Sequence, residues 1–132
     1  MKQLGKKRNI IKELLLLVLA LFLLLILGIP GFFYSFIKMI VTFHWKEAMY
    51  RMAQIIRRVT VAIDEVGNVL IAEFMNDFAI TKDGYLFGDS EETISSCLGR
   101  NQRDQKLRKF GIMVVTILNV FDDNHSIKSI EE

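Results

Sequence analysis

An apolar run near the N-terminus constrains this chain more than any other feature. Residues 14–37 contain no charged side chain, and Leu14–Leu27 (LLLLVLALFLLLIL) is wholly apolar. At about 1.5 Å per residue, a helix of this length reaches about 36 Å, which exceeds the roughly 30 Å of a bilayer's hydrocarbon core. The sequence therefore predicts one transmembrane helix over residues 14–37, preceded by a basic flank at residues 1–13.

A cleaved secretory signal is the main alternative, because a basic start precedes the apolar run. The run is longer than a usual signal core, and the LGIPGFFYSF that follows offers no A-x-A-like cleavage site. No cysteine directly follows the core, so the pattern does not fit a lipoprotein. A hairpin that turned at residues 28–31 would leave arms too short to cross. We therefore expect an uncleaved signal-anchor, with a kink near Gly28 and Pro30.

The distribution of charge indicates the location and the partners. More cations precede the span than follow it closely, which favours a cytoplasmic N-terminus for a single-pass membrane protein. Residues 1–58 carry ten Lys/Arg and two acids, whereas residues 59–132 carry seven and thirteen. A basic segment beside an apolar span is typical of contact with anionic lipids. The expected partners are therefore the lipid bilayer and, as a further candidate, a membrane or envelope protein; no nucleic-acid-binding pattern is present.

The residues after the span predict an all-α fold, with a small domain of about three helices over residues 38–122. Across residues 45–78, apolar side chains recur at spacings of three and four, which places them on one face of a helix. They are Met49, Met52, Ile56, Val59, Ile63, Val66, Leu70 and Phe74. Gly67 is a position where this helix could bend or break. Residues 38–58 could alternatively lie in the headgroup plane as a basic amphipathic helix.

A second apolar helix is predicted after a loop at residues 79–89, where Asp83-Gly84 is a turn signal. The apolar run at residues 110–121 is too short for another crossing and therefore predicts a buried helix. We expect one core in which Met52, Ile56, Val59, Ile63 and Leu70 pack against Ile112, Val115, Ile117 and Leu118. The polar residues 123–132 predict a flexible tail.

The stretch FGDSEETISSCLGR, residues 87–100, has the spacing of a helix start. Asp89 and Glu92 are three residues apart, as in a capping box, although Ser90 could be the cap instead. A short helix over residues 91–98 would then end at Gly99, a residue favoured after a helix. Cys97, the only cysteine, is expected to be a small packed residue.

The same stretch supplies candidate site residues. Asp64 and Asn68 lie one helical turn apart, and other polar side chains could converge on them if the helices fold back. The candidate polar site comprises Asp64, Asn68, Asp89, Glu92, Thr93, Ser95, Ser96, Arg100 and His125. Carboxylates beside one imidazole could hold a hard cation or orient that imidazole as a general base. Neither spacing is diagnostic, so we predict no metal ligands and no cofactor, and the catalytic residues stay unassigned.

Three segments of the second half carry a resemblance. IDEVGNVL, with Asp64 and Asn68, is similar to D-x-x-x-N-x-L, GDSEETISSCLGR to G-D-P-x-E-T-I-S-S-R-x-G-R, and residues 122–126 to a terminal D-x-x-H-C. Together they resemble a family of small uncharacterised tailed-phage proteins over about residues 62–132. Ser90, Cys97 and Ser126 depart from that pattern, and the loss of the final cysteine removes any His/Cys pair. The resemblance implies a phage or prophage origin and a compact helical fold, but no reaction.

Three functions are consistent with these features. The leading hypothesis is a single-pass phage membrane protein that acts by binding, in the cell envelope or in the virion, and is not an enzyme. The second is a membrane-tethered hydrolase that uses an Asp/Glu/His cluster. The third is a lysis-associated membrane protein, although such a protein needs less than an ordered domain.

Overall fold

The computed structural model describes residues 8–130 and divides the chain into two compact units, Met1–Ile56 and Arg57–Glu132. Within the described residues the fold is all-α, and the one β-type pairing is an isolated antiparallel bridge between Ile80 and Leu107. The predicted all-α class is therefore confirmed. The boundary between the two units falls inside a helix, so it differs from the boundary expected at residue 38.

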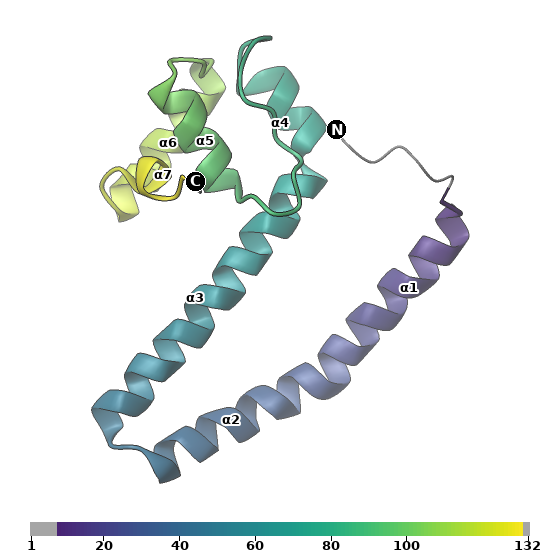
Figure 1. Cartoon of the computed structure of the whole chain (residues 1–132), viewed down its shortest axis with the longest axis vertical. Helices are drawn as coiled ribbons and strands as arrows, with labels where there is room; N and C mark the ends of the chain where they lie inside the picture. Colours follow the sequence, from purple (N-terminus) through teal and green to yellow (C-terminus); the bar gives the residue numbers. More distant parts are fainter. Residues whose placement is uncertain (1–7, 131–132) are drawn as a thin grey trace. The chain divides into compact units, whose positions relative to one another are not determined.

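The first unit contains one long apolar helix, drawn in purple to blue in Figure 1. It consists of α1 (Ile10–Leu23), a π-helical turn η1 (Leu24–Gly28) and α2 (Ile29–Thr42). Asn9 caps its start, because the Asn9 side chain accepts a hydrogen bond from the Ile11 amide at 3.1 Å. Ile10–Thr42, 33 residues, is the one helix among residues 8–130 that is long and apolar enough to cross a membrane.

The π-helical turn explains how the predicted kink site is accommodated. Pro30 has no amide hydrogen, and in a regular α-helix its ring crowds the carbonyl of Ile26, four residues earlier. A π-helical turn widens the backbone at that point. Gly28 and Pro30 therefore interrupt the α-helical geometry, but the helix continues through them to Thr42.

Helix α3 (Trp45–Leu70) starts after a short break at residues 43–44. Phe43 is extended, and the guanidinium of Arg51 lies 4.0 Å from the centre of its ring, a cation–π contact. Arg51 also forms an ion pair with Glu47 at 2.9 Å, one helical turn away. These contacts fix the first turns of α3 against the end of the preceding segment.

The second unit contains the end of α3 and four shorter helices, α4 (Ala72–Phe78), α5 (Ile94–Arg103), α6 (Lys109–Phe121) and α7 (His125–Lys128). The described part of the chain thus has about five helical segments there, where about three were expected. The long helix breaks at Ile71, four residues after the suspected Gly67. The loop predicted at residues 79–89 is present, apart from the bridge at Ile80, but it continues to Thr93, past the expected helix start at residue 91.

The core of the second unit lies around α5, and it differs from the predicted core. It is formed by Met75, Ala79, Ile80, Phe87, Cys97, Leu98 and Val115. The apolar face of α3 is not part of it: Ile63 is 66% exposed and Leu70 is 78% exposed. On α6, Val115 is buried but Ile112 and Ile117 are both 53% exposed. The predicted packing of the α3 stripe against α6 is therefore wrong.

The C-terminal segment is packed against α5, where a flexible tail was expected. Its helix α7 buries Ser126 completely. Gly99 makes this approach possible, because a Cβ atom at that position would overlap the backbone carbonyl of Ser126. Gly99 is thus an interior residue of α5 and not its C-terminal cap. Residues 131–132 of the expected tail and residues 1–7 of the basic flank lie outside the described residues.

Candidate functional site

Three asparagine side chains hold the loop between α4 and α5. Asn68 of α3 donates to the carbonyls of Asp89 at 3.0 Å and Glu92 at 2.8 Å. Asn76 of α4 exchanges two hydrogen bonds with the backbone of Phe87, at 2.8 and 3.2 Å. Each amide group offers both donors and an acceptor, so it replaces a pairing strand for an otherwise unpaired backbone.

Asn101 of α5 is the third of these side chains. It accepts from the Tyr85 amide at 2.7 Å and donates to the Tyr85 carbonyl at 2.8 Å. Asn68 and Asn101 have no exposed surface, which makes both integral to the fold. Of the three, only Asn68 was among the predicted site residues.

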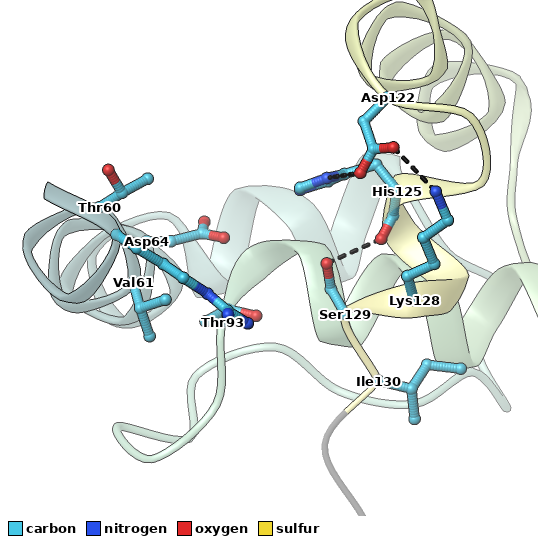
Figure 2. A pocket seen from close by; sticks show the side chains of 10 residues that line it. Thr60, Val61, Asp64, Thr93, Asp122, His125, Lys128, Ser129 and Ile130 are labelled. Carbon is cyan, nitrogen blue, oxygen red and sulfur yellow. Dashed lines mark hydrogen bonds and ion pairs between the residues drawn. The ribbon is translucent and has the colours of Figure 1, made fainter. Parts of the chain in front are cut away.

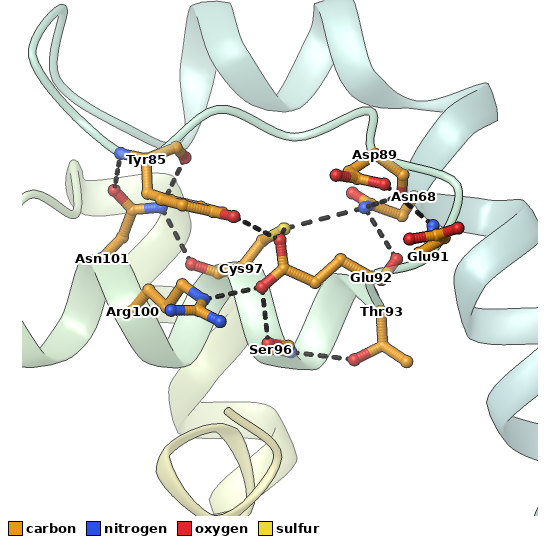
Figure 3. Close-up of polar contacts among 10 residues, drawn as sticks. All are labelled: Asn68, Tyr85, Asp89, Glu91, Glu92, Thr93, Ser96, Cys97, Arg100 and Asn101. Atoms are coloured by element: carbon orange, nitrogen blue, oxygen red, sulfur yellow. Dashed lines mark hydrogen bonds and ion pairs between the residues drawn. The ribbon is translucent and has the colours of Figure 1, made fainter. Parts of the chain in front are cut away.

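Glu92 is the centre of a buried polar network, shown in Figure 3. Its carboxylate accepts from the Tyr85 hydroxyl at 2.6 Å, from Ser96 Oγ at 3.0 Å and from Arg100 Nε at 2.6 Å. Burial raises the pKa of Glu92, but the hydrogen bonds from Tyr85, Arg100 and Ser96 together lower it below its ordinary value. Glu92 therefore stays ionised inside the protein, with its acceptor capacity used by its neighbours.

The same network also shifts the pKa values of the Tyr85 hydroxyl and the Cys97 thiol. The hydrogen bond to Glu92, followed by burial, raises the pKa of Tyr85 to about 12. Burial and then the charge of Glu92 raise the pKa of the Cys97 thiol to about 12. Cys97 has no exposed surface, so the prediction of a packed cysteine is confirmed. A thiol with so high a pKa is a poor nucleophile.

The predicted capping box at Asp89 and Glu92 is wrong. The N-cap of α5 is Thr93, whose hydroxyl accepts from the Ser96 amide at 3.0 Å. Asp89 instead accepts from the Glu91 amide at 2.9 Å in a local turn of the loop. Glu92 is turned inward and does not reach back to Asp89. The spacing of Asp89 and Glu92 fits a cap, but the Glu92 carboxylate is turned toward Arg100, a half-buried side chain of α5 eight residues later.

A pocket of about 580 Å³ lies in the second unit, and Figure 2 shows side chains that line it. Its walls come from α3, from the start of α5 and from the C-terminal segment. The lining residues are Arg57, Thr60, Val61, Asp64, Thr93, Asp122, His125, Lys128, Ser129 and Ile130. This volume lies within the range of small-molecule sites, roughly 300–1,000 Å³.

Two carboxylates in the pocket are held by neighbours. Asp64 of α3 accepts from Ser95 Oγ at 3.0 Å, across to the first turn of α5. Asp122 contacts Lys128 Nζ at 2.8 Å and His125 Nδ1 at 3.2 Å. Lys128 and then His125 hold the pKa of Asp122 below its ordinary value. Figure 2 shows the His125 ring extending from α7 toward the side of the pocket formed by α3.

The predicted site residues therefore fall into separate groups. Asp64, Thr93 and His125 line the pocket, and Ser95 reaches it through its bond to Asp64. The remaining members belong to the loop and the buried network: Asn68, Asp89, Glu92, Ser96 and Arg100. Residues 8–130 contain no group of three or more His, Cys, Asp or Glu arranged to hold a metal ion.

Sequence reasoning missed several pocket residues, although signals for them exist. Arg57, Thr60 and Val61 share the face of α3 that carries Asp64, at spacings of three and four. Asp122 precedes His125 by three residues, which brings the two side chains together. Lys128 and Ser129 carry no such signal, because their place depends on α7 packing against α5.

Comparison with known proteins finds no matching protein-family model, no similar curated protein and no similar solved structure.

Proposed function

We propose that this chain is a single-pass membrane protein that acts by binding a small polar ligand in the pocket of its helical unit. The observation that carries the proposal is the pocket itself, which gathers charged and hydroxyl side chains from three segments of the chain. The buried Glu92 network is a less suitable site, because its hydrogen-bonding groups already satisfy one another.

The membrane assignment is supported by the surface of the helix Ile10–Thr42. None of its residues is buried, and most of its Leu, Ile, Val and Phe side chains are more than half exposed. Soluble proteins rarely expose so large an apolar surface, because each fully exposed side chain of this kind costs about 1.5–3 kcal/mol relative to burial. A bilayer removes that cost. The excess of cations before the span supports a cytoplasmic N-terminus, with residues 57–132 on the outer side.

We expect the protein to remain in the membrane fraction after alkaline carbonate washing, because a spanning helix is not extracted by loss of surface charge. The intact mass of the membrane-bound protein should include the whole apolar helix. A mature product that starts near Gly31 or later would show a cleaved signal and would remove the membrane part of this proposal.

The pocket chemistry favours a ligand with an anionic group. Within the described residues, no hydrogen bond or ion pair engages the Arg57 side chain, whereas Lys128 is paired with Asp122. The Thr93 hydroxyl, which accepts from the Ser96 amide, lines the same space, whereas the Ser129 hydroxyl already donates to the His125 carbonyl at 2.7 Å. A guanidinium with a nearby hydroxyl donor is well suited to phosphate or carboxylate oxygens.

Inorganic phosphate is a direct probe of this pocket. Phosphate should raise the melting temperature of the full chain in detergent, compared with chloride at equal ionic strength, because binding to the folded state stabilises it. Arg57→Gln should abolish the phosphate effect, while Arg58→Gln, which changes an exposed neighbour outside the pocket, should retain it. An equal shift in both variants, or no shift in the parent chain, would contradict an anion site at Arg57.

A second function is favoured by one specific contact. The pairing of His125 Nδ1 with Asp122 at 3.2 Å orients the imidazole, and its other nitrogen is then the acceptor that a general base requires. On this basis the chain would be a membrane-tethered hydrolase with His125 as base. An activity that His125→Gln abolishes without change in melting temperature would favour this function over binding alone.

The resemblance to small tailed-phage proteins supports placing the protein in an infected cell's envelope or in a virion. Asp64, Thr93, Ser95, Asp122 and His125 are residues shared with that pattern that also lie in or beside the pocket. The phage origin is part of the proposal, since it rests on the motifs alone.

A further inference from the structure

We propose that the ligand of the pocket carries a protonated primary amine as well as an anionic group, with the amine bound by Asp64 and the anion by Arg57. This inference rests on the proposed function, because it names the ligand chemistry of the same site. The lining residues all belong to one compact unit, Arg57–Glu132, so the site lies within a single unit of the chain.

The Asp64 side chain has a carboxylate oxygen available for a ligand. Its hydrogen bonds from Ser95 Oγ at 3.0 Å and from the Ser95 amide at 3.5 Å both end on Oδ2. Within residues 8–130 no donor engages Oδ1, although an ionised carboxylate can accept about four hydrogen bonds. Figure 2 shows the Asp64 carboxylate extending from α3 toward the side of the pocket formed by α7. Asp64 can therefore accept from a donor on a ligand.

Arg57 and Asp64 carry opposite charges on one face of α3. Seven residues, about two helical turns, separate them, so their backbone positions lie about 10 Å apart along the helix axis. Within the part of the chain that the structure describes, neither side chain forms an ion pair, whereas Lys128 pairs with Asp122. The pocket wall thus offers an unpaired positive charge and an unpaired negative charge at two different places.

The charge balance of the pocket disfavours a purely anionic ligand. Among the described lining residues, the cations Arg57 and Lys128 are balanced by the carboxylates Asp64 and Asp122, with His125 as the remaining titratable group. An anion bound by Arg57 would be repelled by the unpaired carboxylate of Asp64. An amine on the same ligand replaces that repulsion with a charge-assisted hydrogen bond. A ligand with both charges is therefore the better match.

A primary amine joined by a short chain to a phosphate or a carboxylate has the required chemistry. Its N–H groups can donate to Asp64, which a quaternary ammonium group cannot do. Two sources supply such a ligand. One is the headgroup of phosphatidylethanolamine, and the other is a small soluble compound such as an amino acid or O-phosphoethanolamine.

Calorimetric titration of the full chain in detergent tests this inference with three probes: O-phosphoethanolamine, phosphocholine and inorganic phosphate. O-Phosphoethanolamine should bind about tenfold more tightly than phosphocholine, which has the same charges but no N–H donor; this is the gain expected from one hydrogen bond to a charged group. Asp64→Asn should abolish the preference and retain phosphate binding, because it removes the charge but keeps an oxygen for Ser95. Glu65→Gln, the same charge change outside the pocket, should keep the preference.

Nanodiscs distinguish the two sources of the ligand. If the lipid headgroup occupies the pocket, discs that contain phosphatidylethanolamine should weaken binding of soluble O-phosphoethanolamine by competition, compared with discs of phosphatidylcholine alone. Equal affinity in the two kinds of disc would assign the pocket to a soluble ligand. Either result supports an amine bound by Asp64.

The possible results separate this inference from the proposed function. Equal affinities of the parent chain for all three probes would overturn the amine site but keep the anion site at Arg57. No binding of any probe would remove both. Because this comparison uses the parent chain, it does not depend on the folding of a variant. A preference that Asp64→Asn retains, or an equal loss of all three probes in that variant, would overturn the role of Asp64 as the partner of the amine.

Discussion

Replacing Glu92 with alanine is expected to destabilise the helical unit by about 3–5 kcal/mol, the usual cost of removing one partner of a buried ion pair. Arg100 would keep its charge, with 22% of its side chain exposed, and would lose its acceptor at 2.6 Å. The Tyr85 hydroxyl and Ser96 Oγ would lose the same acceptor. Since small domains are stable by only about 5–15 kcal/mol, denaturant unfolding of the full chain in detergent should show a large loss of stability.

Asp104→Ala is the matched control, because Asp104, the C-cap of α5, pairs with Arg103 but both side chains are about half exposed. Loss of this ion pair should cost at most about 1 kcal/mol.

The contribution of Glu92 to the free energy of unfolding should also depend on pH. Because the pKa of Glu92 is lowered in the folded state, its contribution is present above the ordinary carboxyl value of 4.5 and is lost as the pH falls below it. Equal costs for Glu92→Ala and Asp104→Ala would show that the buried network contributes little.

Gly99→Ala is expected to destabilise the unit by about 2–3 kcal/mol, near the upper end of the usual cost of overpacking. The added methyl group would overlap the carbonyl oxygen of Ser126, a backbone atom that cannot turn away as a side chain can. Alanine favours the helix over glycine by about 1 kcal/mol, so the observed loss is a net value. Release of α7 should be visible as faster tryptic cleavage after Lys128.

Gly67→Ala is the matched control for this substitution. Its methyl group would meet only the Cδ1 atom of Ile94, the end of a flexible side chain, at 2.9 Å. The cost of that contact and the gain in helix propensity are comparable, so stability should change by less than about 1 kcal/mol. If both variants lose the same stability, the close approach of α5 and α7 is not the cause.

The sequence predicted well those elements that are determined by local patterns. The apolar helix, the amphipathic helix after it and the loop that follows were all expected from composition, periodicity and turn residues. The short helices α4 and α7 were not predicted separately, because seven and four residues carry too little periodicity. Their stability comes from tertiary contacts, such as burial of Met75 and Ser126.

The error about the core has a physical reason. Periodicity shows that α3 has an apolar face, but it does not show what that face contacts. The core is built instead from short segments that look like loop or cap in the sequence, including Ala79, Ile80 and Phe87. Asn68 and Asn101, which are polar residues, hold these segments in place from inside the fold. Such hydrogen bonds between distant segments leave no periodic signal.

The candidate site was predicted only in part, again because contacts between distant segments leave no periodic signal in the sequence. Asp64 and His125 were recognised as polar residues that folding could bring together, and both line one pocket. Arg57 was not recognised, because its importance lies in having no acidic partner among the described residues. That property depends on the positions of all its neighbours in space.

The π-helical turn at Leu24–Gly28 has a consequence for any molecule that contacts the apolar helix on both sides of it. One extra residue in a turn rotates all later side chains by about 100° around the helix axis. A stripe that runs along α1 therefore does not continue on the same side of α2. Two neighbouring helices could each follow one half of this segment, whereas a single straight neighbour would match only one of them.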